Sequence, residues 1–421
     1  MGWVFMGFFD NLMVGEVGYV PLAAAGITNS VLFLTSIFGM GILMVVPTLI
    51  SAKRHISERH KLRSLQQESM WLSQILSLLT WVLLLIIYFN FDLLKQETAV
   101  VDEAKPYFLL VALSTFPSMW FMSGKNICDG YEKTKIPMII TLIALALNVL
   151  LNWIFIFGHG VAPMGLFGAG IATLISRIFM AVSISIYMHK NVDLIGNNYP
   201  SESILPFKKW IHLKEILALG VPSGLQYFFE VAAFAFAAIM AGWIGARELA
   251  AHQIGITLSS VTYMFALGIS TSASIIIGNA LSKNNIDKIK KAGTTALFLI
   301  AAIMAVFGVA FLLFRQALAE AFSTDPVVIT LTTSLLLIAS AYQIFDGVQA
   351  VGLGVLRGMR DVKKPLFLTL FSYWGMSIPL AYYLAFYVKM GVIGIWIGLT
   401  FGLISSSLLL SLRFRYLTKN K

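Results

Sequence analysis

Residues 334–361 read SLLLIASAYQIFDGVQAVGLGVLRGMRD, a predominantly apolar run that ends in a short basic stretch. A run of about 20 such residues is long enough to cross a bilayer as a helix. The apolar part of the stretch holds one acid, Asp346. A carboxylate at membrane depth is costly enough that it normally faces a bundle interior or a water-filled cavity. The stretch therefore predicts a membrane-spanning helix that carries a functional acid.

The rest of the chain has the same composition. Of its 421 residues, 58% are hydrophobic and only 12% are charged, whereas about a quarter of a soluble domain is charged. We therefore expect an all-α integral membrane protein with no sizeable soluble domain. The net charge of +10 comes from short basic clusters between apolar runs, without interleaved aromatics. These clusters indicate membrane topology and give no support for nucleic-acid binding.

Polar breaks divide the apolar sequence into twelve predicted helices. Their approximate spans are 1–15, 22–50, 70–91, 104–124, 136–157, 164–188, 213–241, 248–278, 293–314, 327–354, 365–388 and 392–413. If the breaks alternate sides, 24 of the 30 Lys and Arg residues fall on one side, and Arg177 lies inside a span. Because basic loops stay in the cytoplasm, we expect a multi-pass protein of the plasma (inner) membrane with both termini cytoplasmic.

The sequence also contains an internal duplication. LMVGEVGYVPLAAAGI (12–27) matches IMAGWIGARELAAHQI (239–254), CDGYEKTKIP (128–137) matches LRGMRDVKKP (356–365), and MGLFGAGIA (164–172) matches MGVIGIWIG (390–398). An even number of six helices per repeat keeps both halves in the same orientation, so the predicted pseudo-twofold runs along the membrane normal. We expect an N-terminal six-helix lobe over 1–190, a cytoplasmic linker over 191–212 and a C-terminal six-helix lobe over 213–421.

The repeat leaves the first helix short. The first helix of the second half begins near Leu213, and subtracting the repeat offset falls before residue 1. We expect the first helix to lack its cytoplasmic half, and a late-assigned start or a shortened chain explains this more simply than a functional half-helix.

Three acids lie within the predicted spans: Asp10, Glu230 and Asp346. Each could pair structurally with a buried cation or hydroxyl, but three together favour an ion or substrate pathway. None has an acidic counterpart in the other repeat, where the matching positions are Ala237, Trp3 and Met119. The carboxylates thus belong to individual halves, which suits cation binding at particular helices.

Other oxygen-bearing side chains lie near these acids. Tyr342 precedes Asp346 by four residues, so its hydroxyl shares a helical face with the carboxylate and can help to coordinate a cation. Asn148 and Asn152 share a face in the same way, and Asp10 could complete their cluster if the first and fifth helices are neighbours. The asparagines could instead be interhelical hydrogen bonds, worth about 1 kcal/mol. Arg177 could pair with Asp10 or snorkel to the membrane surface.

Helix-breaking residues and missing motifs narrow the function further. Pro47, Pro117, Pro222 and Pro379 lie in or near spans, where each frees a backbone carbonyl and permits a kink. The chain has no phosphate-binding GKS or GKT, no HExxH, and only one cysteine, Cys128. We therefore expect no ATP dependence, no disulfide, no cofactor and no enzymatic activity.

The segments GFFDNLMVGEVG, LGVPSGLQYFFEVAAFAFAAIMAGWIGARELAAHQI, LNVLLNWIFIFGHG and YQIFDGVQAVGLGVLRGMRDVKKP closely resemble the multidrug and toxic compound extrusion (MATE) family, in particular its NorM-like branch. The similarity runs through both repeats. It implies a twelve-helix exporter of cationic drugs driven by inward Na⁺ or H⁺. Glu230, Asp346 and Tyr342 match the family's cation site in the C-terminal lobe, a possible Na⁺ site, and Asp10 with Asn148 and Asn152 match its N-terminal-lobe site.

We thus expect a secondary active antiporter that works as a monomer in the lipid bilayer and moves small organic cations. One alternative is a flippase for lipid-linked sugars, which shares a related scaffold and predicts buried basic residues. Another is an intramembrane aspartyl protease, for which Asp10 and Asp346 lack the local context. Oxygen ligands suit both Na⁺ and H⁺, so the coupling ion stays open.

Overall fold

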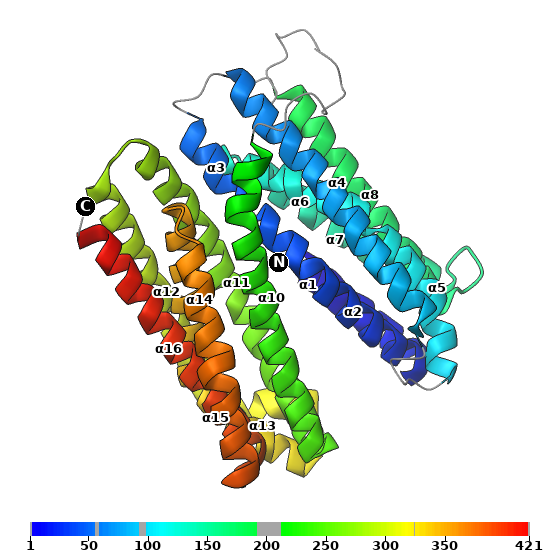
Figure 1. Ribbon diagram of the computed structural model, residues 1–421. Helices are drawn as coiled ribbons and strands as arrows, with labels where there is room; N and C mark the ends of the chain where they lie inside the picture. The colour runs from blue at the N-terminus through cyan, green and yellow to red at the C-terminus, as the bar shows by residue number, and fades with distance from the viewer. Residues whose placement is uncertain (1, 55–58, 92–97, 192–211, 324, 420–421) are drawn as a thin grey trace. The chain divides into compact units, whose positions relative to one another are not determined.

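The computed structural model describes residues 2–54, 59–91, 98–191, 212–323 and 325–419, and every regular element within these ranges is a helix (Figure 1). The prediction of an all-α protein is therefore confirmed for the described residues. Ten helices in these ranges are long and apolar enough to cross a membrane. The predicted count of twelve is not reached on this criterion, because two of the expected spans have a different form.

The chain divides into two compact units, residues 1–50 with 54–224 and residues 51–53 with 225–421. The first unit contains α1 (Gly2–Val17), α2 (Tyr19–Leu43), α3 (Val46–Lys53, shared with the second unit), α4 (Arg59–Phe89), α5 (Thr98–Leu113), α6 (Thr115–Gly130), α7 (Lys135–Phe157) and α8 (Gly165–Lys190). The boundary falls inside α10 (Leu213–Ile244). Residues 192–211 of the predicted linker lie outside the described residues.

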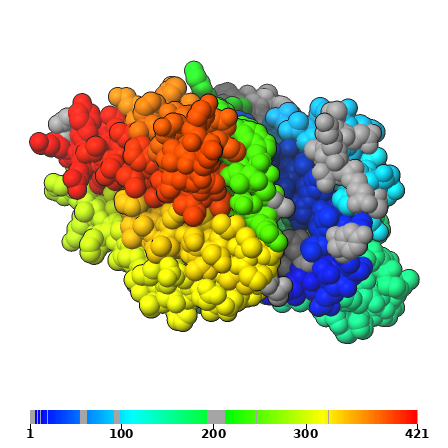
Figure 2. All heavy atoms as spheres, turned by 90° about the horizontal axis from the view of Figure 1, so that it is seen from below, coloured from blue at the N-terminus to red at the C-terminus, as the bar shows by residue number. Residues whose placement is uncertain are grey.

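The second unit continues with α11 (Ala246–Ser282), α12 (Ile286–Phe322), α13 (Pro326–Gly358), α14 (Lys363–Leu370), η3 (Phe371–Ser377), α15 (Ile378–Tyr382), η4 (Tyr383–Tyr387) and α16 (Gly391–Lys419). Helix α13 packs against α11, α12 and α16. Figure 2 shows the yellow atoms of α13 against the orange and red atoms of the C-terminal helices. Asp346 therefore lies on a helix that has three helical neighbours within its unit.

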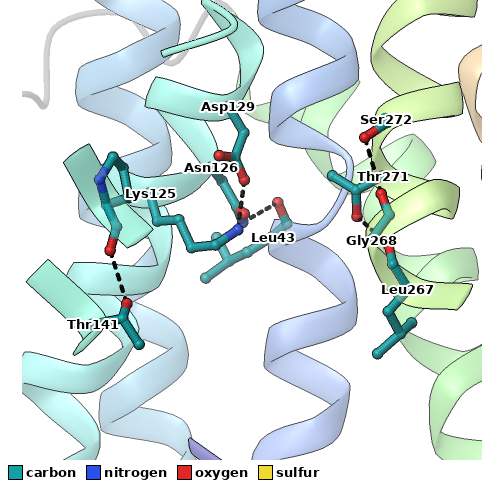
Figure 3. A network of polar contacts seen from close by, with 10 residues as sticks. Leu43, Lys125, Asn126, Asp129, Thr141, Leu267, Gly268, Thr271 and Ser272 are labelled. Atoms are coloured by element: carbon teal, nitrogen blue, oxygen red, sulfur yellow. Dashed lines mark hydrogen bonds and ion pairs between the residues drawn. The ribbon is translucent and has the colours of Figure 1, made fainter. Parts of the chain in front are cut away.

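The predicted span 22–50 is broken at Pro47. Helix α2 ends at Leu43 and α3 begins at Val46, because Pro47 has no N–H to donate to the carbonyl of Leu43 four residues earlier. Asn126 of α6 supplies the missing donor: its Nδ2 lies 2.9 Å from the Leu43 oxygen (Figure 3). The span 104–124 likewise divides at Ser114, three residues before Pro117.

The predicted span 365–388 is a helix of alternating type. Two π-helical segments, η3 and η4, interrupt it. The N–H of Ile378 donates to the carbonyl of Tyr373, five residues earlier, and Val388 does the same to Tyr383. Pro379, which has no N–H to donate, lies in the first turn of α15, directly after η3. The other expected span is α1, whose 16 residues are short of a full crossing.

The duplication seen in the sequence is repeated in the backbone. Gly18 and Gly245 precede α2 and α11 with φ of 155° and 170°. Glu132 and Arg360 both have left-handed φ, 63° and 61°, although neither is glycine. Gly165 and Gly391 open α8 and α16 with φ of 54° and 59°. Each pair falls within one of the three matched sequence segments.

Candidate functional site

The first buried acid, Asp10, lies on α1 where this helix packs against α7 and α8. Its side chain is 4% exposed. Asn152 of α7 donates to Oδ1 at 2.6 Å, and Thr173 of α8 donates to Oδ2 at 3.1 Å. The structure therefore brings Asp10 and Asn152 together, as expected if the first and fifth helices are neighbours.

The amide groups beside Asp10 have spare hydrogen-bonding capacity. Asn148, one turn before Asn152 on α7, is fully buried, and neither its amide nitrogen nor its amide oxygen makes a hydrogen bond. It interacts with the Asp10 carboxyl group at longer range. The Oδ1 of Asn152 also makes no hydrogen bond. Buried polar atoms in this state are costly, so the cluster favours a ligand that oxygen atoms can hold.

Arg177 lies in the same region of the first unit. It is 8% exposed and sits one turn after Thr173 on α8, with its Nη1 donating to Ser114 Oγ at 2.6 Å. Its charge acts on Asp10. The guanidinium group is therefore held inside the unit beside the acid, and the snorkelling interpretation is wrong.

The second unit holds the other two acids together. Glu230 on α10 and Asp346 on α13 are each 5% exposed, and the charge of Asp346 acts on Glu230. Gln349, one turn after Asp346, donates its Nε2 to Glu230 Oε1 at 3.2 Å. Oε2 of Glu230 is buried and makes no hydrogen bond. One carboxylate oxygen is thus available for a ligand.

Aromatic residues surround this pair of acids. Tyr342 is 2% exposed, and its ring lies 5.5 Å from that of Trp396 on α16. Both Asp346 and Glu230 act on its hydroxyl group. The structure therefore places Glu230, Asp346 and Tyr342 in one buried cluster. Tyr263 of α11 also lies next to Glu230.

Several members of the two clusters were missed in the sequence. They are Thr173 and Ser114 in the first unit and Gln349, Tyr263 and Tyr373 in the second. The one available signal was a polar side chain within one helical turn of an acid or of Arg177, which Gln349 and Thr173 satisfy. The others depend on which helices become neighbours.

The buried charges also differ from those inferred from the spans. Arg357 belongs to the short basic stretch that indicates topology, but it is 3% exposed and donates to Tyr227 Oη at 3.0 Å, with the guanidinium 5.5 Å from the ring centre. Asp129 is 4% exposed and pairs with Lys125 at 2.5 Å (Figure 3). Glu68 is 3% exposed and accepts from the His212 backbone N–H at 2.8 Å. Polar residues adjoin each of these groups in sequence, so an apolar run does not reveal their burial.

Spanning helices that carry buried acids in oxygen-rich clusters define a class of protein, the integral membrane transporters. Comparison with known proteins narrows the class. The model of the MatE family matches residues 2–154 and 222–383, and the chain belongs to this family. The family consists of transporters and not of enzymes.

Curated relatives match the chain over nearly its full length. The probable multidrug resistance protein NorM of Mesorhizobium japonicum is 31% identical, covering 98% of this chain and 90% of the relative. The probable multidrug resistance protein NorM of Pasteurella multocida is 32% identical, covering 97% of this chain and 89% of the relative. The multidrug resistance protein MdtK of Yersinia pseudotuberculosis is 30% identical, covering 98% of this chain and 92% of the relative.

Solved structures share the fold. The eukaryotic MATE transporter AtDTX14 aligns with a TM-score of 0.86 at 22% identity, over 97% of this chain and 90% of that one. A multidrug resistance MATE family transporter in an outward-facing conformation aligns with a TM-score of 0.88 at 21% identity, over 100% and 92%. At these identities the likeness concerns the fold alone.

Proposed function

We propose that the chain is a secondary active antiporter that exports cationic drugs or other organic cations in exchange for inward Na⁺ or H⁺. The single observation that carries the proposal is the buried pair Glu230 and Asp346, with a carboxylate oxygen that makes no hydrogen bond. The names of the curated relatives, which describe multidrug resistance proteins, support the class of substrate.

The chemistry follows from charge. Two carboxylates in a low-dielectric interior repel each other, and each is stabilised by a cation or a proton. Arg357 is the basic group whose charge acts on Glu230, so two ionised acids leave one negative charge uncompensated. Na⁺ held by oxygens of Glu230, Asp346 and Tyr342, a proton, or a cationic substrate can each balance it. Binding of one then lowers affinity for the others, which couples the two fluxes.

Asp10, Asn148 and Asn152 form a second proposed ion or substrate cluster. Support comes from the buried amide oxygens that make no hydrogen bond next to the Asp10 carboxylate. Thr173 adds a fourth oxygen. No redox or organic cofactor enters this mechanism, because displacing one cation by another moves charge without bond chemistry.

The proposal includes an architecture. Twelve helices would form two six-helix lobes related by a pseudo-twofold along the membrane normal, in a monomer of the inner membrane with both termini cytoplasmic. The repeated backbone turns support the two lobes, and the distribution of 24 of the 30 basic residues supports the orientation. Alternation of the lobes between inward-open and outward-open states would carry the substrate across.

The test is efflux of a fluorescent organic cation from vesicles that contain the purified protein, with a Na⁺ gradient and a proton gradient imposed separately. We expect one gradient to drive efflux, and we expect Glu230→Gln and Asp346→Asn each to abolish it while the protein stays folded in the membrane. Asp361→Asn is the matched control, because this aspartate pairs with Arg413 at 2.7 Å, away from the cluster. Gradient-driven efflux that survives in the Glu230→Gln, Asp346→Asn double variant would contradict the proposal.

The lipid-linked flippase is not favoured. It needs buried basic groups that neutralise a pyrophosphate, whereas each buried arginine of the two clusters acts on an acid, Arg177 on Asp10 and Arg357 on Glu230. An aspartyl protease needs two aspartates that share a site. Among the described residues, Asp10 is held by Asn152 and Thr173, and the acid that acts with Asp346 is Glu230.

A further inference from the structure

A chain of buried hydrogen bonds leads from Glu230 to the π-helical segment η3. Gln349 Nε2 donates to Glu230 Oε1 at 3.2 Å, and Tyr373 Oη donates to Gln349 Oε1 at 2.9 Å. Gln349 is fully buried and Tyr373 is 1% exposed. Both ends of the Gln349 amide are therefore used, one by the acid on α10 and one by a tyrosine in η3.

A second contact links η3 to the same turn of α10. The indole N–H of Trp374, next to Tyr373, donates to the backbone carbonyl of Phe229 at 3.1 Å. Phe229 directly precedes Glu230. At the other end of η3, Ser377 donates to the carbonyl of Gly398 on α16 at 3.0 Å. The segment thus joins the turn that carries Glu230 to α16.

The amide of Gln349 can respond to the charge on Glu230. An ionised carboxylate only accepts hydrogen bonds, so it fixes the Gln349 NH₂ group toward Glu230 and leaves the carbonyl for Tyr373. A cation held by the Glu230 carboxylate neutralises its charge and so weakens the bond that the Gln349 NH₂ group donates to Oε1. The Gln349 amide is then held less firmly, and so is the carbonyl that accepts from Tyr373.

We propose that Gln349 is a positioning residue that senses whether Glu230 is charged and free or loaded with the coupling ion, and transmits this state to η3. The inference rests on the proposed function, in which Glu230 takes up that ion. A π-helical turn suits the receiving role, because its wide i→i+5 turns are weaker than those of an α-helix and can convert to them by a small shift in register. Loading of Glu230 would then alter the helix between α14 and α15.

Other groups that face Glu230 set the strength of this response. They are Asp346, Tyr342 and Arg357 on α13, Tyr263 on α11 and Tyr373 in η3. Tyr227, on the same helix as Glu230, accepts from Arg357. Tyr373 is the member of this group that lies in η3, and it is linked to Glu230 by its hydrogen bond to Gln349. The route through Gln349 can therefore be broken without removing a charge from the cluster.

The experiment places a reporter on η3. Cys128 is buried, so a Cys128→Ser chain with Phe371→Cys, at a position that is 58% exposed, can carry a single bimane label. The labelled protein is titrated with NaCl at fixed pH and with acid at fixed Na⁺, and ion binding is measured separately by calorimetry. We expect the bimane signal to change with the same midpoint as ion binding.

Gln349→Met tests the relay, because it keeps the side-chain length and removes both hydrogen bonds. We expect it to bind the ion while losing the bimane response, and its efflux to fall in kcat with little change in KM for the ion. Tyr373→Phe should give the same result if Gln349→Met does not fold. Gln343→Met is the matched control, since Gln343 is equally buried on α13 and its amide makes no hydrogen bond.

The outcomes separate the two proposals. Ion binding with an intact bimane response in Gln349→Met and Tyr373→Phe overturns the relay and leaves the antiporter standing. Ion binding without a bimane response in the Gln349-intact protein also overturns the relay. Absence of ion binding in that protein overturns both.

Discussion

The contact between Asn126 and Leu43 shows how a single side chain holds the bend of a helix. Pro47 leaves the Leu43 carbonyl without its helical donor, and the Asn126 amide from α6 replaces that donor at 2.9 Å. Asn126 is 4% exposed, so water does not easily take its place. The bend between α2 and α3 is thereby tied to α6.

Asn126→Ala should lower the free energy of unfolding by about 1–3 kcal/mol, the cost of leaving a buried carbonyl without a partner. Pro47→Ala restores the N–H at position 47, so the same Asn126→Ala change should cost less in that background. Thermal unfolding in detergent of the two single variants and the double variant measures the difference. Strictly additive effects would show that Asn126 does not replace the proline's donor.

At this scale, the sequence reveals some site residues and hides others. Asp10, Glu230 and Asp346 stand out because an acid in an apolar run has few explanations. Thr173 and Gln349 do not stand out, since the side chain of a threonine or glutamine can form a hydrogen bond within its own helix in many membrane proteins. Which partner it takes in another helix depends on which helix becomes its neighbour. The burial of Arg357 was also out of reach, because a basic stretch beside a span indicates topology first.

Glycines on α16 set how closely this helix approaches the interrupted helix before it. Gly394, Gly398 and Gly402 lie four residues apart, and a Cβ at each would meet Leu384, Ala381 and Ser377. At Gly398 the nearest atoms are the Cα and N of Ala381, 2.5 Å away, so the backbone would have to move. Close helix packing through small residues is a common device in membranes.

Gly398→Ala should therefore destabilise the second unit by about 1–3 kcal/mol through overpacking. Gly268→Ala on α11 is the matched control, because nothing lies within 4 Å of a Cβ built there, and a helical alanine is favoured over glycine by about 1 kcal/mol. Detergent thermal unfolding compares the two. Equal stabilities would show that the close approach is not rigid.

The first turn of α13 is capped by Asp325. The carboxylate accepts from the backbone N–H groups of Val327 at 2.8 Å and Val328 at 3.4 Å, and Arg247 lies 3.0 Å away. The Val327 N–H holds the pKa of Asp325 below its ordinary value; desolvation opposes this, and Val328 and Arg247 add to it. A depressed pKa means that the cap stabilises the helix above the ordinary value and is lost as pH falls through the lower one.

Hydrogen exchange at the first amides of α13 should therefore be slow near neutral pH and lose its protection at acidic pH, after correction for the intrinsic rate. Asp325→Asn keeps a neutral cap and should remove most of this pH dependence. An unchanged pH profile in Asp325→Asn would assign the effect to another group.

Helix types were only partly predictable. The break at Pro47 could be predicted, because proline lacks an N–H and removes one helical hydrogen bond whatever the rest of the fold. The π-helical turns of η3 and η4 were not predictable, since a shift from i+4 to i+5 depends on how the 363–387 segment packs against α16. The same local rule did not act at Pro222, which lies inside a continuous α10.

At the scale of the whole chain, the orientation in the membrane can be tested at the two ends of one helix. Thr134 precedes α7 and Val161 follows it, and both are exposed. In a Cys128→Ser background, Thr134→Cys should react with a membrane-impermeant thiol reagent from the cytoplasmic face and Val161→Cys from the opposite face. The reverse pattern would invert the proposed topology.

The all-helical class was accessible from the sequence because hydropathy acts along the chain. The approach of α1 to α7 that joins Asp10 to Asn152 required the folded structure. The assembly of Glu230 on α10 with Asp346 on α13 also required the folded structure, because the sequence pattern of a helix does not predict which helix packs against it.

The left-handed turns at Glu132 and Arg360 bear on the history of the chain. An L-residue in this conformation costs about 1 kcal/mol, yet both copies keep it without a glycine. Three residues before each turn, one copy has Asp129 and the other Arg357, opposite charges at one inherited position. Duplication thus passed on the shape of the backbone and left the side chains free to diverge, so that one half could acquire Glu230 and Asp346 without the other having to change.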